Sequence, residues 1–200
     1  MIKNTKYNAF CTLLEMLEDR KYNIPDEYKQ IDINTFNYLY NNKKADIFIN
    51  CHLNEEKKIY IKFIYDSYKP SIIKDYIFDI NNDFLGNEKD KLILVFNKKP
   101  NNSILKINKE KEFNIVDIFW IDILQFNITK HEFVPKHELL EQDELNILMK
   151  KYNITNLLQF PIILRSDPII KYYDFSPGRV CKITRPSITS YNHVYYRYIK

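Results

Sequence analysis

The chain has 200 residues, a net charge of +4 at pH 7 and 45% hydrophobic residues, which suit one or two globular domains with buried cores. It contains no run of about 20 apolar residues and opens on no basic-then-apolar segment, so we expect neither a membrane-spanning helix nor a secretory signal peptide. Three isolated cysteines argue against a disulfide framework and favour a reducing compartment.

The first 126 residues alternate helical and strand patterns. Apolar residues at helical spacing predict a helix over residues 5–22, capped by Thr5, and a shorter helix over 35–40. A further helix is predicted to begin at Pro70. Alternating or continuous apolar runs predict strands at 45–49, 58–65, 91–96 and 113–119. This order of elements predicts a small α/β domain.

The pattern changes near residue 127, which predicts a domain boundary between residues 1–126 and 127–200. An extended segment broken by Pro135 comes first, and a helix over residues 141–152 follows it. The inner stripe of this helix is expected to contain Leu145, Leu148, Met149 and Tyr152.

The remaining residues read as a compact β unit. We expect turns at Pro168, Pro177 and Gly178. An alternating strand is predicted at 179–185, ended by Pro186, with a partner strand at 193–199. Along the first of these strands, Cys181 and Ile183 should face one way and Val180, Lys182 and Thr184 the other. The second domain is therefore predicted as a small mixed β-sheet with a helix.

Signals for catalysis are weak. The two glycines, Gly86 and Gly178, are too far apart to build a phosphate-binding loop. His131 and His137 are six residues apart, which fits no usual zinc spacing. We therefore predict no metal ion and no cofactor.

One enzyme hypothesis starts from Asp46 on one predicted strand and Lys62 on the next. In a metal-dependent nuclease a second carboxylate would help to hold the Mg²⁺ that polarises the phosphate. The residue two positions before Lys62 is Tyr60, and a phenol cannot replace that carboxylate. An active nuclease is disfavoured, and the alternative is that Asp46 and Lys62 are solvated strand positions.

A polar segment around Pro100 is a candidate for contact with nucleic acid. Lys98, Lys99, Asn101 and Asn102 flank the proline. Such a loop can touch a phosphate backbone without reading sequence. From the residues alone, a solvated loop is the favoured alternative.

Residues 165–200 contain seven basic and two acidic residues, interleaved with apolar and aromatic ones. The tail could be a nucleic-acid surface with tyrosine platforms. It could equally be a protein-docking surface, in which arginine and tyrosine are enriched. Composition does not separate the two.

The order and spacing of several segments over about residues 126–200 resemble the small H-type subunit of archaeal RNA polymerase. The assembly domain of the fifth subunit shared by the eukaryotic nuclear RNA polymerases is similar to the same segments. These are HEFVPKHELL, KKYNI, FPIILRSDPIIKYY, GRVCKITRPS and YYRY. The earlier segment FCTLLEMLEDRKYNI resembles the opening helix of the eukaryotic subunit's jaw domain, which the archaeal protein lacks.

The resemblance implies a non-catalytic polymerase subunit that has no membrane or small-molecule partner. Its second domain would dock on the largest polymerase subunit, and its first, the jaw, would lie beside downstream duplex DNA. The jaw fold is similar to a nuclease fold without its active site. The family's DNA-approaching loop aligns with Lys98, Lys99, Pro100, Asn101 and Asn102.

The resemblance also implies a set of subunit-docking residues. Three belong to a turn signature and one to the turn before a strand, and the others are histidines, prolines, a serine and basic residues. They are His131, Pro135, His137, Arg165, Asp167, Pro168, Tyr172, Gly178, Lys182, Arg185, Pro186, Ser187 and Arg197.

The chain departs from the family pattern at positions where the family usually has glycine. Asp174 should tolerate a left-handed backbone, whereas Tyr191 predicts a rebuilt loop before the last strand. These departures, together with an amino-acid composition typical of an AT-rich genome, favour an origin in a large cytoplasmic DNA virus. The protein would then be located in the virion and the host cytoplasm. A cellular origin implies the nucleus. The alternative function is a free-standing protein that binds duplex DNA.

Overall fold

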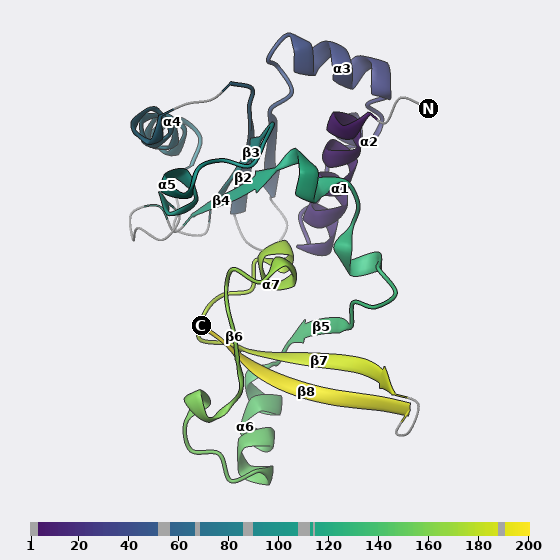
Figure 1. The fold of residues 1–200 in the computed structure, drawn as a ribbon, viewed down its shortest axis with the longest axis vertical. Coiled ribbons are helices and arrows are strands. Elements are labelled where there is room, and N and C mark those ends of the chain that lie inside the picture. Colours follow the sequence, from purple (N-terminus) through teal and green to yellow (C-terminus); the bar gives the residue numbers. More distant parts are fainter. Residues whose placement is uncertain are drawn as a thin grey trace. The chain divides into compact units, whose positions relative to one another are not determined.

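The computed structural model describes residues 4–51, 57–66, 69–85, 90–107, 113, 115–187 and 191–200, and for residues 50, 51, 187, 191 and 192 only the backbone. The chain divides into two compact units, Met1–Phe126 and Asn127–Lys200 (Figure 1). Among the helices of the described part, none is long and apolar enough to cross a membrane.

The first unit is built on a four-stranded mixed sheet with the order β1-β2-β3-β4. The edge strand β1 (Ile47–Cys51) runs antiparallel to β2 (Lys57–Ile64). Strands β3 (Lys91–Phe96) and β4 (Val116–Trp120) continue the sheet in parallel with β2. The parallel strands β2 and β3 therefore end at the same edge of the sheet, which is where α/β proteins commonly place their binding residues.

Helices cover both faces of this sheet (Figure 1). On one face, isoleucines of α4 (Pro70–Asp83) and α5 (Asn102–Leu105) pack on β2, β3 and β4. On the other, Phe10 of α1 (Thr5–Asp19) meets Phe36 of α3 (Ile33–Asn41) at 4.7 Å between ring centroids, and Phe36 meets Phe63 of β2 at 6.1 Å. Short helices α2 (Asp26–Lys29) and η3 (Ile121–Leu124) complete the unit.

The outer edge of β1 is protected by a side chain rather than by another strand. The Tyr28 hydroxyl donates to the Phe48 carbonyl at 3.2 Å and accepts from the Phe48 amide at 3.3 Å. An unpaired edge presents free backbone groups to other chains. One phenol therefore satisfies both outward backbone groups of Phe48, the second residue of β1.

Replacing Tyr28 with phenylalanine is expected to lower the free energy of unfolding of the first unit by about 1–2 kcal/mol, because two backbone hydrogen bonds are lost. Urea denaturation followed by circular dichroism measures the loss. Tyr38→Phe is the control, because that side chain is 69% exposed. Equal stability of the two variants would contradict the assigned role of Tyr28.

The second unit is a four-stranded mixed sheet with the order β5-β7-β8-β6. A long hairpin of β7 (Val180–Ser187) and β8 (Tyr191–Ile199) forms its centre. Strand β5 (Lys136–Leu139) pairs antiparallel with β7, and the two-residue β6 (Ile162–Ile163) pairs parallel with β8. The single-turn helices η4 (Ile128–Lys130) and η5 (Leu157–Gln159) lie in the connections.

Each face of the second sheet has its own apolar cluster. Helix α6 (Gln142–Lys151) contributes Leu145 and Leu148 to a cluster with Val180. Helix α7 (Pro168–Tyr173) contributes Ile170 to the cluster on the other face, which contains Cys181 and Ile183. The predicted alternation of side chains along β7 is therefore confirmed, as is the mixed α+β fold with two sheets.

Several local predictions were wrong. The residue that caps α1 is Asn4, not Thr5, because the Asn4 side chain accepts from the Tyr7 amide. Tyr152 does not belong to the inner stripe of α6, because it follows the last helical residue and is 59% exposed. Pro186 does not end its strand, since β7 continues to Ser187. Pro168 opens the helix α7 rather than a turn.

Candidate nucleic-acid and subunit interfaces

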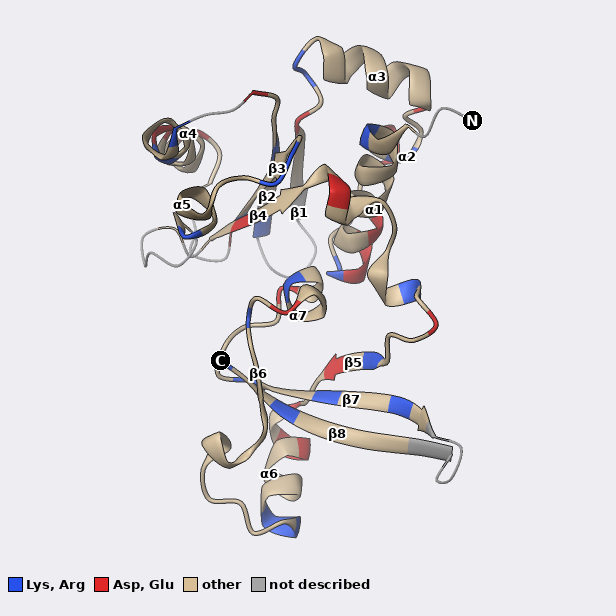
Figure 2. Ribbon diagram, viewed as in Figure 1, with Lys and Arg blue, Asp and Glu red and all other residues tan. Residues whose placement is uncertain are grey.

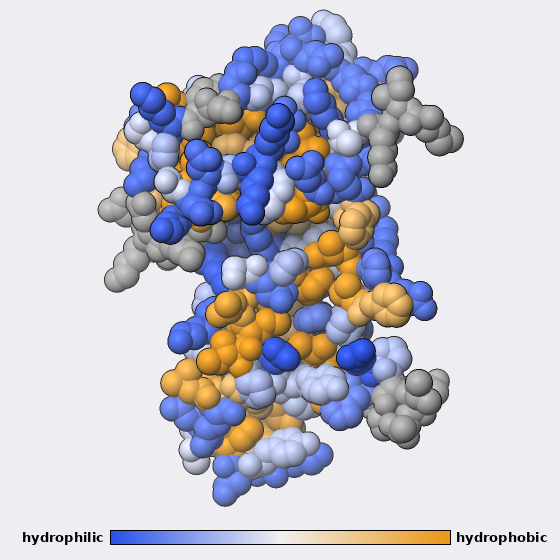
Figure 3. Space-filling model, in the orientation of Figure 1, coloured by the Kyte–Doolittle hydropathy of each residue, from blue (hydrophilic) through white to orange (hydrophobic). Residues whose placement is uncertain are grey.

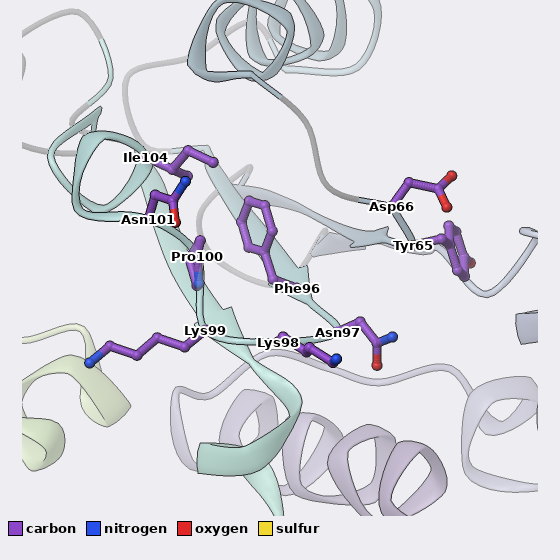
Figure 4. A pocket seen from close by; sticks show the side chains of 9 residues that line it. All are labelled: Tyr65, Asp66, Phe96, Asn97, Lys98, Lys99, Pro100, Asn101 and Ile104. Atoms are coloured by element: carbon purple, nitrogen blue, oxygen red, sulfur yellow. The ribbon is translucent and has the colours of Figure 1, made fainter.

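The loop between β3 and α5 places the predicted DNA-proximal residues at the carboxyl end of the parallel strands. Lys98, Lys99, Asn101 and Asn102 are exposed, and Pro100 is half-buried. The loop forms one wall of an open pocket of about 360 Å³ (Figure 4). Lining residues outside the loop are Tyr65, Asp66, Phe96 and Ile104.

The charged side chains around this pocket differ in the contacts that they make. Asp66 accepts from the Lys43 ammonium at 2.8 Å, and both side chains are more than half exposed. The Lys99 ammonium lies 5.9 Å from the centre of the Trp120 ring. Lys98 contacts no carboxylate and no ring in the part of the chain that the structure describes. The loop therefore offers two cations and two exposed amides, a combination suited to phosphate oxygens.

Asp46, Tyr60 and Lys62 come together near the start of β1. The Asp46 carboxylate accepts from the Lys62 ammonium at 2.5 Å, from the Tyr60 hydroxyl at 3.4 Å and from the Phe63 amide at 3.1 Å. The side chains of Asp46 and Lys62 are only 18% and 29% exposed. The expectation of solvated strand positions was therefore wrong, and the carboxylate instead ties the segment before β1 to β2.

This cluster offers a metal ion a single carboxylate whose two oxygens already accept hydrogen bonds. Hard cations such as Mg²⁺ need several oxygen ligands. In the described ranges, no group of three or more histidine, cysteine or acidic side chains is arranged to hold a metal ion. The geometry therefore indicates that the cluster has a structural role. The Tyr60 phenol occupies the position at which the nuclease hypothesis requires a second carboxylate.

Tyr60 of this cluster and the nearby Tyr65 both have raised pKa values. Burial raises the pKa of Tyr60 to about 12, and the neighbouring Asp46 carboxylate contributes to the shift. Burial also raises the pKa of Tyr65 to about 12. In the unfolded chain both should titrate near the ordinary value of about 10.

We predict that the first unit loses stability as the pH rises from about 10 to about 12. In that window the unfolded chain releases protons from Tyr60 and Tyr65 that the folded chain still holds, so unfolding is favoured. Urea midpoints measured between pH 9 and 12 test this, with Tyr60→Phe as the variant. A Tyr60→Phe protein whose midpoint falls as steeply as that of the parent would contradict the assignment.

Several predicted docking residues turn out to build the second unit. Asp167 caps α7 by accepting from the Ile169 amide at 2.9 Å, and Pro168 is the first helical residue. Tyr172 is 3% exposed. Gly178 has φ +86°, and its amide donates to the Ile199 carbonyl at 3.0 Å. These four residues fix the local fold of the unit; Tyr172 is buried and Asp167 half-buried, whereas Pro168 and Gly178 reach the surface.

Asp174 confirms one expectation about the departures from the family. It ends α7 with φ 52°, in the left-handed region that favours glycine. Tyr191 is the first residue of β8, and residues 188–190 before it lie outside the described ranges. The prediction of a rebuilt loop there stays a prediction.

The two predicted docking histidines hold local turns. His137 Nδ1 lies 2.7 Å from the Pro135 carbonyl, an oxygen that accepts hydrogen bonds. His131 Nδ1 accepts from the Phe133 amide at 3.2 Å, and Phe133 is 84% exposed. His131 remains exposed, whereas Pro135 and His137 are half-buried.

Basic residues lie on both strands of the β7–β8 hairpin (Figure 2), and the strand register divides them between the two faces of the second sheet. Arg185 shares the α7 face with Cys181 and Ile183, whereas Lys182 shares the α6 face with Val180. Strand pairing sets Arg197 opposite Cys181 and therefore on the α7 face. Exposed Pro186 lies on the same face as Lys182, and the side chain of Ser187 is not among those described.

Two further residues that sequence reasoning missed lie on the α7 face. His193 pairs with Arg185 and Tyr195 with Ile183, and both are exposed. His137 of β5 pairs with Ile183 from the other side. The alternation of side chains along each strand could have assigned these residues to one face, but only if the pairing register between the strands had been known. The register could not be predicted from the sequence alone.

Apolar side chains also reach the surface of the second unit (Figure 3). Leu158 is 61% exposed, Leu164 57% and Ile162 43%. Arg165, half-buried, follows this segment, and its amide donates to the Lys200 carbonyl at 2.9 Å. Exposed apolar residues beside arginine and tyrosine are typical of protein interfaces.

These observations define a class of protein before any relative is considered. The described residues offer an exposed basic loop on one unit and a mixed basic, aromatic and apolar surface on the other. Exposed surfaces of these kinds are typical of binding and assembly modules.

Comparison with known proteins identifies the family. The family model described as RNA polymerase Rpb5, N-terminal domain, matches residues 4–113, and the one described as RNA polymerase Rpb5, C-terminal domain, matches residues 126–199. The chain therefore belongs to the RNA polymerase Rpb5 family, as the resemblance predicted.

Curated relatives agree with this result. The chain is 33% identical to the Arabidopsis thaliana subunit 5B of DNA-directed RNA polymerases IV and V, over 96% of this chain and 88% of that protein. It is 30% identical to subunit rpabc1 of DNA-directed RNA polymerases I, II and III from Dictyostelium discoideum, over 93% and 92% respectively.

An archaeal relative matches only about a third of this chain but nearly all of its own length. Subunit Rpo5 of the DNA-directed RNA polymerase of Methanococcus maripaludis is 42% identical over 72 residues, which are 36% of this chain and 91% of that protein. All three relatives are named as polymerase subunits and none as an enzyme by itself. The prediction of a polymerase component rather than a free-standing enzyme is confirmed.

Proposed function

We propose that the chain is a non-catalytic subunit of a multisubunit DNA-directed RNA polymerase. The observation that carries the proposal is the match of both Rpb5 domain models, in order, to residues 4–113 and 126–199. Relatives named as polymerase subunits cover more than nine-tenths of the chain. Its partners are then other polymerase subunits and DNA, with no membrane, cofactor or small-molecule substrate.

The second unit docks on the largest polymerase subunit. Arg185, Arg197, His193 and Tyr195 lie together on the α7 face of its sheet and are exposed, which supports a docking role. Arginine and tyrosine are the residues that most often anchor such interfaces. Asp167, Tyr172 and Gly178 serve docking indirectly, by holding the fold that presents this face.

The first unit acts as a jaw beside downstream duplex DNA. Exposed Lys98 and Lys99, with the amides of Asn101 and Asn102, support a contact with the phosphate backbone. Such contacts carry no sequence information, which suits a polymerase that moves along any template.

Site-specific photo-crosslinking in the assembled polymerase tests the jaw assignment. A photoreactive residue at position 98 is expected to label downstream duplex DNA in a transcribing complex, whereas one at the exposed Lys150 of the second unit is not. Absence of any label from position 98 in an active complex would overturn the contact.

The alternative is a free-standing protein that binds duplex DNA. A protein using all seven basic residues of the tail would lose affinity steeply as salt rises. A docking subunit binds DNA only weakly by itself, with a shallow salt dependence. Binding of a labelled duplex by the isolated chain between 50 and 200 mM salt, about the range in which phosphate contacts weaken, separates the two.

The site of action follows from the polymerase that the chain serves. A subunit of a large cytoplasmic DNA virus would act in the host cytoplasm and be packaged in the virion, and a cellular subunit would act in the nucleus. The AT-rich bias of the composition and the loss of family glycines at Asp174 and Tyr191 lead us to propose the viral origin.

A further inference from the structure

The two lysines of the β3–α5 loop differ in how they are held. The Lys99 ammonium lies 5.9 Å from the centre of the Trp120 ring, within the range of a cation–π contact. Lys98, the adjacent residue of the same charge and also exposed, makes no such contact with any ring in the described ranges. Among the described residues, the two lysines therefore form a matched comparison of a cation that contacts an aromatic ring with one that does not.

The Trp120 side chain is held in place by core packing. It is the last residue of β4, and the sheet register places it beside Phe96, the last residue of β3 before the loop. The indole is half-buried and packs against the apolar cluster that contains Phe96 and Ile104. Its ring is therefore anchored in the core at the point where the basic loop begins.

A lysine whose side chain is already restricted by a contact loses less conformational entropy when it binds an anion than an unrestricted lysine does. A long ammonium side chain loses rotamer freedom when it contacts a phosphate, and that loss opposes binding. Contact with an anchored ring restricts Lys99 before the phosphate arrives, while the ammonium remains exposed. Figure 4 shows Lys99 extended away from the pocket rather than folded over it.

We propose that Trp120 is a positioning residue that preorganises Lys99 for contact with a DNA phosphate. The proposal rests on the proposed function, because it assigns a part to a residue behind the jaw's candidate DNA-contacting loop. Trp120 does not touch DNA in this proposal. It acts through Lys99 and not through Lys98.

A double-mutant cycle on the full chain tests the proposal. The variants are Lys99→Gln, Lys98→Gln, Trp120→Leu, Trp120→Phe, and the two combinations of Trp120→Leu with a lysine change. The measurement is anisotropy of a labelled 30-base-pair duplex at several salt concentrations, starting near 20 mM. Circular dichroism confirms that each variant is folded.

Each lysine change is expected to weaken binding several-fold and to reduce the slope of log affinity against log salt by about one. Trp120→Leu should weaken binding about threefold with the slope unchanged, because all charges remain. Trp120→Phe should restore affinity, because it keeps an aromatic face. In the Trp120→Leu background, Lys99→Gln should cost clearly less than in the parent, whereas Lys98→Gln should cost the same.

Two failures are distinguishable. If neither lysine change alters binding or its salt dependence, the DNA contact of the proposed function is wrong, and the positioning role falls with it. If both lysines matter but the cost of Lys99→Gln is equal in the two backgrounds, the DNA contact stands and the role of Trp120 is overturned. Failure of Trp120→Phe to restore affinity would also overturn that role.

Because the chain contains a single tryptophan, its fluorescence gives an independent check. Removing the nearby ammonium with Lys99→Gln should change the emission of Trp120 in the absence of DNA, and Lys98→Gln should leave it unchanged. Identical spectra for both variants would contradict the contact itself.

Discussion

Replacing Asp117 with alanine should be among the most damaging single changes to the first unit, with a loss of about 3–5 kcal/mol in the free energy of unfolding. The Asp117 carboxylate on β4 lies 3.3 Å from the Arg20 guanidinium at the end of α1. The two side chains are 7% and 3% exposed. Asp117→Ala takes an ion-pair partner away from a buried guanidinium, and breaking a buried pair by removing one partner costs far more than the pair contributes.

Urea denaturation followed by the fluorescence of Trp120 measures this loss, because the only tryptophan lies in the first unit. The control is Glu18→Ala, which breaks a pair with Lys29 whose side chains are about half exposed. Exposed pairs are screened by solvent and contribute little to stability. A loss for Asp117→Ala no larger than for Glu18→Ala would show that the pair is not buried as described.

Replacing Ile199 with alanine should destabilise the second unit by about 2–5 kcal/mol, the usual cost of emptying a core position. Ile199 is fully buried in the cluster on the α7 face. Its backbone also bonds in both directions, with its amide donating to the Arg179 carbonyl and its carbonyl accepting from the Gly178 amide. A change of side chain leaves those bonds in place, so the cavity dominates.

Far-UV circular dichroism reports on both units and tryptophan fluorescence on the first alone, so the two signals together isolate the second. Val194→Ala is the control, because Val194 lies on the same strand but is 36% exposed. We expect Ile199→Ala to lower only the transition seen by circular dichroism. Equal effects of the two variants would contradict the assigned core.

The sequence predicted the fold well where the backbone conformation depends on one residue or on a short run of residues. The continuous apolar run at 91–96 is β3, and Pro70 opens α4 as the preferred first residue of a helix. Asp174 occupies the left-handed position expected of it. In each case the cause lies within a few residues of the effect.

Helix α7 was missed although its signal was present. Asp167 followed by Pro168 matched a turn signature, but an aspartate cap followed by proline is equally a typical helix start. The next residues, Ile169 and Ile170, pack into the core as a short helix allows. The capping geometry would have favoured a helix over a turn.

The parts of the candidate sites that were not predictable depend on contacts between distant residues. Arg20 and Asp117 are 97 positions apart, and Tyr28 protects a strand 20 positions away. The partnership of Lys99 and Trp120 needs the parallel pairing of β3 and β4. Periodicity identifies faces within one element, whereas register and packing decide which elements meet.

The central claim is that this chain is a polymerase subunit, and affinity purification from its native source tests it most directly. A tagged chain is recovered at moderate salt after nuclease treatment, and its partners are quantified by mass spectrometry. We predict recovery of the two largest polymerase subunits in near-equal amount with the chain, and their identity would also decide between a viral and a cellular origin. Recovery of the folded chain without large polymerase subunits, together with DNA retained when nuclease is omitted, would contradict the claim and favour the free-standing DNA-binding protein.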